Sequence, residues 1–359
     1  MQITDLANEI LLHVFQSSTN ISSLLALAST CKHFHSILAR AYLPTLYQAT
    51  EAQYGPLTDA IRVVTHNNTQ SAHLARPAPP QSLALLKQII EIGKVANEWA
   101  IVYPSQKWRG EDSASRRLLS EGEKYCLRRA CYRTWLYNLA FHNPAHSRTQ
   151  RLMPQVVRMR ALLLRPWPSQ QLAEILDLQS IFRQVMHSQI CPSNGTVLRR
   201  HKQRYPEDTI PYVITTGFAK ARDECVGLQH GHIYSTQQPV SRFKSQRNTV
   251  VEGWGDEITQ YYVVEDMLKL DPGQLMYLFA GVTGQIGSDA ASFGAGHDCL
   301  MGAKGLVEHF VAGLGEWFEN NGETLKETIG RVVEDRGEDF DAVLGMVQDG
   351  WAGIARIED

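Results

Sequence analysis

The sequence is poor in cysteine, and its cysteines are widely spaced. Only six of the 359 residues are cysteine, and no two of them form a Cys-x-x-Cys pair. Disulfide-stapled domains and zinc ribbons depend on closely spaced cysteines. The pattern therefore argues against both, and it favours a reducing compartment, which means a cytoplasmic and/or nuclear protein.

Long hydrophobic runs are also missing. A helix needs about 20 consecutive apolar residues to span a bilayer, and no segment of the sequence approaches this length. The first residues, Met1 to Asp5, lack the basic and apolar regions of a secretory signal. We therefore expect neither secretion nor a membrane partner.

The net charge of −2 conceals an uneven distribution. Residues 1–210 contain 24 Lys and Arg and 14 Asp and Glu, a net charge of +10. Residues 211–359 contain 11 Lys and Arg and 23 Asp and Glu, a net charge of −12. An asymmetry of this kind is consistent with two folding units.

Helical patterns dominate what is present. Apolar residues recur every three or four positions in several segments, as expected for amphipathic helices. These segments are residues 10–15, 24–28, 31–38, 85–99, 127–139, 325–333 and 340–351. Ser120 and Glu123 fit a capping box at the start of one helix. We predict a predominantly all-α fold.

Clusters of potentially reactive residues do not meet the requirements of a catalytic or metal site. His142 and His146 have a metal-ligand spacing only if they share a helix, and Pro144 interrupts that helix. A second set, Cys225, His230 and His232, lacks a fourth ligand. The glycines between 281 and 305 lack the residues that complete a nucleotide loop. We expect no enzyme activity, cofactor or metal.

A basic run at Arg199–Arg204 and an acidic segment at 334–341 stand out by charge. The basic run is consistent with a nuclear-localisation signal or a nucleic-acid contact. A solvated surface segment is the simpler interpretation, so we do not expect nucleic acid as a partner. The acidic segment is interpreted as the exposed side of helices or as a partner of the basic middle of the chain.

The first 40 residues carry the most specific pattern. Leu6-Ala7-Asn8-Glu9-Ile10-Leu11 opens it, and Leu24-Leu25-Ala26-Leu27-Ala28-Ser29-Thr30-Cys31-Lys32-His33-Phe34 closes it. In order, spacing and residue type this resembles an F-box, which begins Leu-Pro-x-Glu-(Ile/Leu)-Leu and ends Cys-(Lys/Arg)-x-(Trp/Phe). Two positions depart from the family: Ala7 replaces the usual Pro, and Ser18 replaces an apolar residue at the end of the first helix.

The resemblance implies a non-catalytic subunit of a ubiquitin ligase complex. F-box proteins are substrate receptors of SCF-type cullin-RING ligases: the three-helix F-box docks onto the Skp-type adaptor, and through it onto the cullin scaffold. The rest of the chain holds a protein substrate, whose identity the sequence does not specify. On this resemblance the adaptor-binding residues are Leu6, Ile10, Leu11, Val14, Phe15, Leu24, Leu27, Cys31 and Phe34. Some face the adaptor and some fill the core, and the sequence does not separate the two sets.

The expected domains are an F-box over 1–48, a linker over 49–82, and a mainly helical receptor region over 83–359 with a sub-boundary near 190–250. Within the receptor region, Arg128–Tyr137 and Leu268–Gly273 resemble segments of F-box proteins from filamentous fungi. One alternative is an F-box scaffold or regulatory interaction protein that acts outside the ligase, and another is an enzyme with an F-box-like start. Recovery of the adaptor and of the cullin separates these possibilities.

Overall fold

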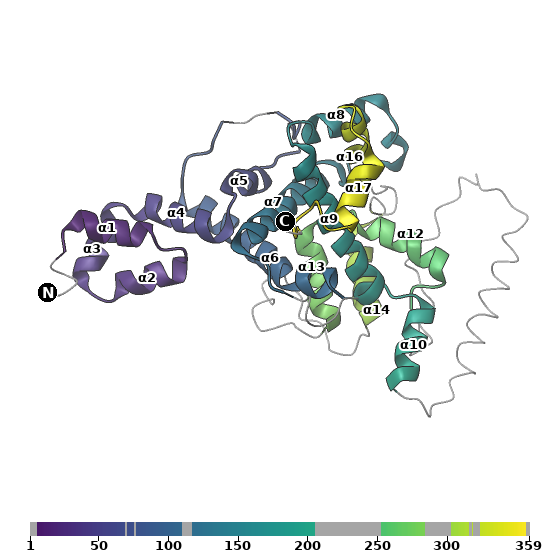
Figure 1. The fold of residues 1–359 in the computed structure, drawn as a ribbon, viewed down its shortest axis with the longest axis horizontal. Helices are drawn as coiled ribbons and strands as arrows, with labels where there is room; N and C mark the ends of the chain where they lie inside the picture. The colour runs from purple at the N-terminus through teal and green to yellow at the C-terminus, as the bar shows by residue number, and fades with distance from the viewer. Residues whose placement is uncertain are drawn as a thin grey trace, which may run out of the picture. The chain divides into compact units, whose positions relative to one another are not determined.

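The computed structural model is helical throughout the part of the chain that it describes (Figure 1). That part comprises residues 6–68, 70–74, 77–109, 117–204, 253–283, 303–315, 318 and 324–356. These residues form 15 α-helices and no strand, which confirms the predicted all-α class. No helix among them is long and apolar enough to cross a membrane.

The chain divides into two compact units. The first contains Met1–Phe182, Leu270–Met276 and Glu323–Asp359, and the second contains Arg183–Lys269 and Tyr277–Gly322. The chain therefore leaves the first unit and returns to it twice. The sub-boundary expected near 190–250 falls inside the second unit.

Five short helices begin the first unit: α1 (Asn8–Gln16), α2 (Ile21–Ser29), α3 (Lys32–Arg40), α4 (Tyr42–Tyr54) and α5 (Leu57–Val64). Helix α3 packs on both α1 and α2, and each of the three also contacts α4. Both α4 and α5 pack on α6 (Leu83–Lys107). Helix α4 thus connects the N-terminal three helices to the rest of the unit.

The core of the first unit lies between long helices. After α6 come α7 (Glu121–Phe141), the short 3-10 helix η3 (Arg148–Gln150), α8 (Pro154–Leu164) and α9 (Ser169–Val185). Large aromatic side chains of α6, α7 and α9 are fully buried, among them Trp99, Tyr132 and Phe182. The rings of Trp99 and Phe182 lie 4.5 Å apart between centroids. Burial of this much aromatic surface is the main source of stability in such a core.

The returning segments close this core. The start of α13 (Pro272–Thr283) meets α7 and α6: Asn138 Nδ2 donates a hydrogen bond to Leu270 O at 2.8 Å, and Trp99 Nε1 donates to Pro272 O at 3.0 Å. The C-terminal helices are α16 (Leu325–Glu334), which packs on α8, and α17 (Phe340–Gln348). The helices predicted from the periodicity of residues 325–333 and 340–351 are therefore present, although α17 ends at Gln348.

The second unit is built around a π-helical turn, η4 (Met186–Ile190), that continues α9. The turn η4 contacts α12 (Glu257–Met267) and α14 (Ala303–Leu314). Helix α10 (Asn194–Arg204) follows η4 in the chain. Gln260 Nε2 on α12 donates to Cys191 O at 2.7 Å, just after the π-helical turn. This bond satisfies a backbone carbonyl that the end of the helix leaves open.

The segment expected to be a linker is partly helical. Residues 49–54 complete α4, and Leu57–Val64 form α5, whose Leu57, Ala60 and Val63 are buried. Their three-residue spacing indicates a short helix. The Asn- and Pro-rich residues that follow make the whole segment look like a linker. The capping box predicted at Ser120 and Glu123 is confirmed, with both of its hydrogen bonds present. Cys225, His230 and His232 lie outside the described residues, as does most of the glycine-rich segment.

Three arginines of α7 hold distant parts of the first unit together. Arg129 forms two hydrogen bonds to the buried Glu174 of α9, at 2.9 and 2.5 Å. Arg133 Nε donates to Asp59 of α5 at 3.1 Å, and Arg128 Nε donates to Gly55 O at 2.9 Å. The charges of Arg129 and Arg133 are thus compensated by carboxylates, whereas Arg128 is satisfied by a backbone carbonyl. These three arginines of α7 therefore form contacts within the first unit.

A partly buried acid at the start of α13 predicts a pH-dependent stability. Burial raises the pKa of Asp271 to about 6, although its carboxylate caps the helix by accepting from Gln274 N at 2.9 Å. In the unfolded chain the group ionises near pH 4. Native Asp271 therefore holds its proton longer than the unfolded chain does, and its contribution to stability is lost as the pH rises from about 4 through about 6.

Asp271→Asn keeps the capping acceptor and removes this titration. The variant is expected to exceed the wild type in free energy of unfolding by roughly 1–2 kcal/mol at pH 7.5, with a smaller difference at pH 4.5. Urea unfolding at the two pH values measures it. If the stability difference between the variant and the wild type grows toward low pH, the raised pKa of Asp271 is contradicted.

Candidate interaction surface on the N-terminal helices

The three N-terminal helices enclose a small apolar core. Leu11 and Phe15 of α1, Leu24 of α2 and Phe34 of α3 are at most 5% exposed. The rings of Phe15 and Phe34 meet edge to face, with centroids 6.0 Å apart and an interplanar angle of 89°. Other buried members of this core are Ala28, Ile37 and Leu38. These residues fill the core of the three helices, and other apolar residues of the same helices remain outside it.

Local capping fixes where two of these helices begin. Asn20 caps α2 by accepting from the backbone N–H of Ser22 at 2.7 Å and of Ser23 at 3.3 Å. Cys31 caps α3 through its sulfur, which accepts from Phe34 N at 3.5 Å. By contrast, α1 begins after Ala7, and no side chain caps it. Cys31 therefore has a structural role in the module whatever else it contacts.

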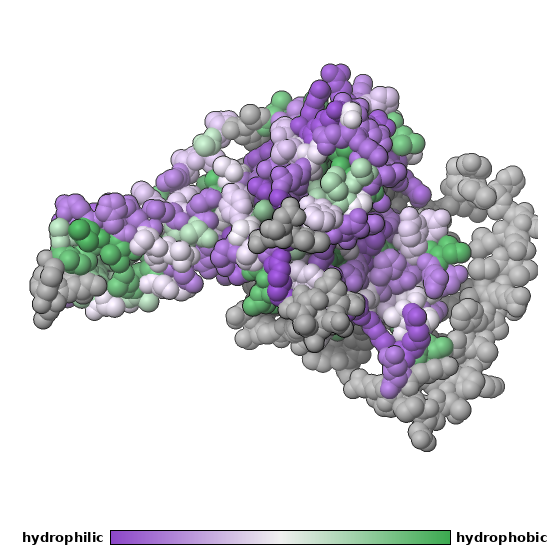
Figure 2. Space-filling model, in the orientation of Figure 1, coloured by the Kyte–Doolittle hydropathy of each residue, from purple (hydrophilic) through white to green (hydrophobic). Residues whose placement is uncertain are grey.

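Other apolar residues of the same helices point outward. Ile10 is 52% exposed, Val14 40% and Leu25 41%. In an α-helix one residue is a rotation of about 100°, so Ile10 and Val14 form a stripe beside the core-facing stripe of Leu11 and Phe15. Figure 2 shows apolar residues gathered on the surface of these helices. We call Ile10 and Val14, four residues apart on α1, the outer apolar face; Leu25 is a further exposed apolar residue, on α2.

The structure thus separates the nine residues that the F-box resemblance assigns to the adaptor. Leu11, Phe15, Leu24 and Phe34 fill the core and are not available to a partner. Ile10 and Val14 are exposed, while Leu6, Leu27 and Cys31 are partly exposed.

Sequence reasoning missed Leu25. Its core neighbours Leu24 and Ala28 are four residues apart, and that spacing was the available signal that Leu25 faces away. Ser18, where the F-box pattern has an apolar residue, lies at the end of the face, and its hydroxyl donates to Asn20 O at 3.2 Å. A polar group thus ends the apolar stripe of α1.

Two buried acidic residues of α9 are engaged by protein donors. Glu174 and Asp177 are fully buried on α9, and their oxygens are engaged. Glu174 binds Arg129, while Asp177 accepts from Tyr103 Oη at 2.6 Å, Lys107 Nζ at 2.8 Å and Ile354 N at 2.9 Å. A carboxylate that accepts three protein donors away from solvent has a structural function.

The two histidines, His142 and His146, both lie beyond the last residue of α7, so they do not share a helix. His142 is the C-cap and is buried, with Nε2 3.5 Å from Thr324 Oγ1. His146 lies in the next turn, with Nδ1 3.2 Å from Asn143 Oδ1. The helix end that Pro144 predicted is therefore present. Among the described residues, no group of three or more His, Cys, Asp or Glu is arranged to hold a metal ion.

No protein-family model, curated protein or solved structure matches this chain. The resemblance to an F-box therefore depends on the residues of the N-terminal segment themselves.

Proposed function

We propose that the chain is the substrate-recognition subunit of an SCF-type cullin-RING ubiquitin ligase and that it docks onto the Skp-type adaptor through α1–α3. The observation that supports this most directly is the outer apolar face of Ile10 and Val14, on a module whose core is already filled. It coincides with the segment whose order and spacing of residues resemble an F-box.

The energetics of the module favour a partner on this face. Fully burying an exposed Val, Leu or Ile side chain is worth about 1.5–3 kcal/mol, and about half of the surface of Ile10 and Val14 is still left to cover. Adjacent exposed apolar residues on a small helical module are typical of a protein interface. An amphipathic helix that offers two anchors four residues apart fits the helix-in-groove mode of recognition.

In this proposal the protein performs no bond chemistry. It positions a bound substrate near the ubiquitin-loaded conjugating enzyme, so its contribution to ubiquitin transfer is proximity. The helices from α6 onward then supply the receptor part, as predicted for residues 83–359. The scaffold alternative shares the adaptor contact but lacks the cullin.

Replacing one anchor by a charge tests the docking surface. Ile10→Asp is expected to weaken binding of the purified Skp-type adaptor about 30-fold, because a buried interface anchor is worth about 2 kcal/mol or more. Acidic residues are tolerated in the first turn of a helix, so α1 is expected to remain folded. Isothermal titration calorimetry on the full-length chain measures the change.

Leu83→Asp is the matched control. Leu83 is the first residue of α6 and is 55% exposed, compared with 52% for Ile10. The two variants carry the same charge change at equally exposed, apolar helix-start positions, and only Ile10 belongs to the proposed interface. Equal adaptor affinity of the Ile10→Asp variant and the wild type would refute the proposed interface. If the adaptor binds but the cullin is not recovered with the complex, the scaffold function is favoured.

A further inference from the structure

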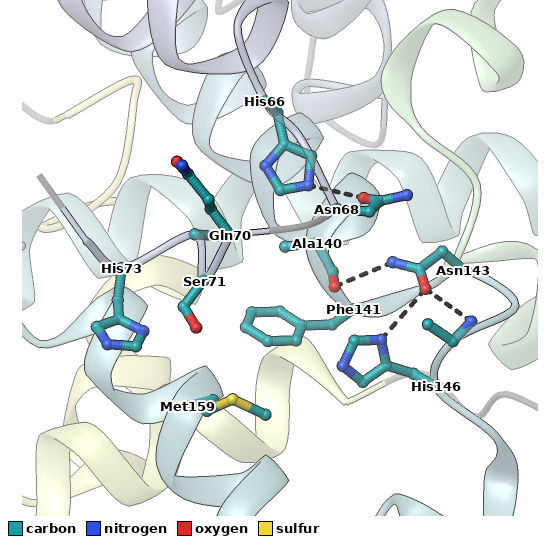
Figure 3. A pocket seen from close by; sticks show the side chains of 12 residues that line it. His66, Asn68, Gln70, Ser71, His73, Ala140, Phe141, Asn143, His146 and Met159 are labelled. Atoms are coloured by element: carbon teal, nitrogen blue, oxygen red, sulfur yellow. Dashed lines mark hydrogen bonds between the residues drawn. The ribbon is translucent and has the colours of Figure 1, made fainter. Parts of the chain in front are cut away.

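The first unit contains a cavity that the adaptor-docking proposal does not use. It measures about 210 Å³ and lies between the residues that follow α5, the end of α7 and α8. Figure 3 shows Ser71, His73, Phe141, His146 and Met159 around one space. Asn68, Gln70 and Ala145 at its edge are exposed, so the cavity opens to solvent.

The size and lining of the cavity restrict what it can hold. Pockets for drug-sized ligands usually occupy about 300–1,000 Å³, so this one suits a single side chain. None of the lining residues is charged at neutral pH apart from histidine. A charged ligand group would lose its hydration without an opposite charge to replace it. A purely apolar group would leave imidazole and amide groups unsatisfied.

The backbone fixes the hydrogen-bonding state of His146. Asn143 Nδ2 donates to Leu139 O at 2.9 Å and to Ala140 O at 3.0 Å, and its Oδ1 accepts from Ala145 N at 3.0 Å. The amide orientation is therefore determined, and Oδ1 must also accept from His146 Nδ1, 3.2 Å away. With the proton on Nδ1, Nε2 of the neutral ring is an acceptor. Burial, together with Arg160, lowers the pKa of His146, which favours that neutral ring.

Apolar and aromatic groups complete the lining. The ring of Phe141 meets that of His146 edge to face at 5.6 Å, and the thioether of Met159 lines the same space. Aromatic rings prefer such edge contacts, and methionine sulfur packs favourably against them. The cavity therefore matches a flat ring that carries one hydrogen-bond donor.

We propose that this cavity binds a single tyrosine side chain of a protein ligand, whose O–H donates to Nε2 of His146. Leu74, next to His73 in the chain, is 55% exposed and provides an apolar contact for residues flanking that side chain. The role of this ligand as a substrate rests on the proposed ligase function, whereas the binding itself does not. Residues 66–73 then belong to the receptor, although the sequence places them in a linker.

The test uses two probes that differ only in a hydroxyl group, N-acetyl-tyrosinamide and N-acetyl-phenylalaninamide, with the full-length chain. Ligand-observed NMR titration is expected to show saturable binding of the tyrosine probe and about tenfold weaker binding of the phenylalanine probe, because a lost hydrogen bond leaves His146 unpaired. Absence of saturable binding of the tyrosine probe, or equal binding of the two, overturns the proposal.

Two variants locate the site. His146→Phe keeps a ring but removes the acceptor, and it is expected to abolish the difference between the probes. Ala145→Trp narrows the exposed edge and is expected to abolish binding of both. Unchanged binding in the Ala145→Trp variant also overturns the proposal, even if His146→Phe does not fold. Ile10→Asp is the control that must retain probe binding while losing the adaptor, so failure of the cavity and failure of the docking surface give different results.

Discussion

Asp177→Ala is expected to lower the free energy of unfolding of the first unit by about 3–5 kcal/mol. The carboxylate is fully buried and holds three donors from different parts of the chain: Tyr103 and Lys107 of α6 and the backbone N–H of Ile354. Alanine leaves the Tyr103 phenol and the Ile354 amide without this acceptor, and the Lys107 ammonium group keeps only Val347 O, 3.3 Å away. Burial and the neighbouring Asp177 raise the pKa of Tyr103, so the phenol stays a donor. Urea unfolding at neutral pH measures the loss.

An exposed ion pair provides the control. Lys94 and Glu91 on α6 are 3.2 Å apart, and both side chains are more than half exposed. The Lys107–Asp177 pair has a similar separation of 2.8 Å, but its carboxylate is inaccessible. Glu91→Ala is expected to change the free energy of unfolding by no more than about 0.5 kcal/mol, because exposed pairs contribute little. Similar losses in the two variants would show that burial does not determine the effect.

The same contact can be tested from the C-terminal side. Gly353 has a φ of 106°, and a Cβ there would lie 2.6 Å from Asp177 Oδ2. Gly353→Ala therefore strains the backbone and displaces the segment that Asp177 holds. Both substitutions release the same contact, the one between Asp177 and residues 353–355. The double variant is therefore expected to lose less stability than the sum of the two single losses. Full additivity would mean that residues 353–355 are held by other contacts.

The N-terminal helices illustrate how far the sequence predicts this fold. The spacing of Ile10, Leu11, Val14 and Phe15 predicts a helix, and the helix is present. It does not tell which pair of residues is buried, because both pairs are four residues apart and apolar. Only the packing of α3 and α4 against one side of α1 makes the choice. Periodicity therefore predicts the element, and tertiary contacts determine the surface.

Contacts between distant residues account for the remaining differences. Asp59 lies in the segment expected to be a linker, but its pairing with Arg133 on α7 holds α5 in the core. His66 and His146 line the same cavity, although they are 80 residues apart in the sequence. No local pattern of turn residues or apolar spacing contains this information. The polar residues that join segments of the first unit were thus visible in the sequence only as isolated charges and histidines.

Phe15→Ala is expected to destabilise the N-terminal module by about 3–5 kcal/mol, the usual cost of removing a buried phenylalanine ring. Phe15 is 1% exposed and packs edge to face on Phe34. A core of three short helices has little stability in reserve, so α1–α3 are expected to unfold locally. Hydrogen exchange is the measurement: amide protection in α2 and α3 should fall, while protection in α7 is retained.

Ile10→Ala is the control for this core substitution. Ile10 is on the same helix but half exposed, so its truncation is expected to leave exchange protection nearly unchanged. Adaptor affinity then separates the two mechanisms. Ile10→Asp removes a contact and weakens the adaptor without loss of protection, whereas Phe15→Ala weakens it in proportion to the fraction of modules that remain folded. If Phe15→Ala reduced adaptor binding while protection of α2 and α3 stayed at the wild-type level, Phe15 would be an interface residue and the division of α1 into a core stripe and an outer apolar face would be wrong.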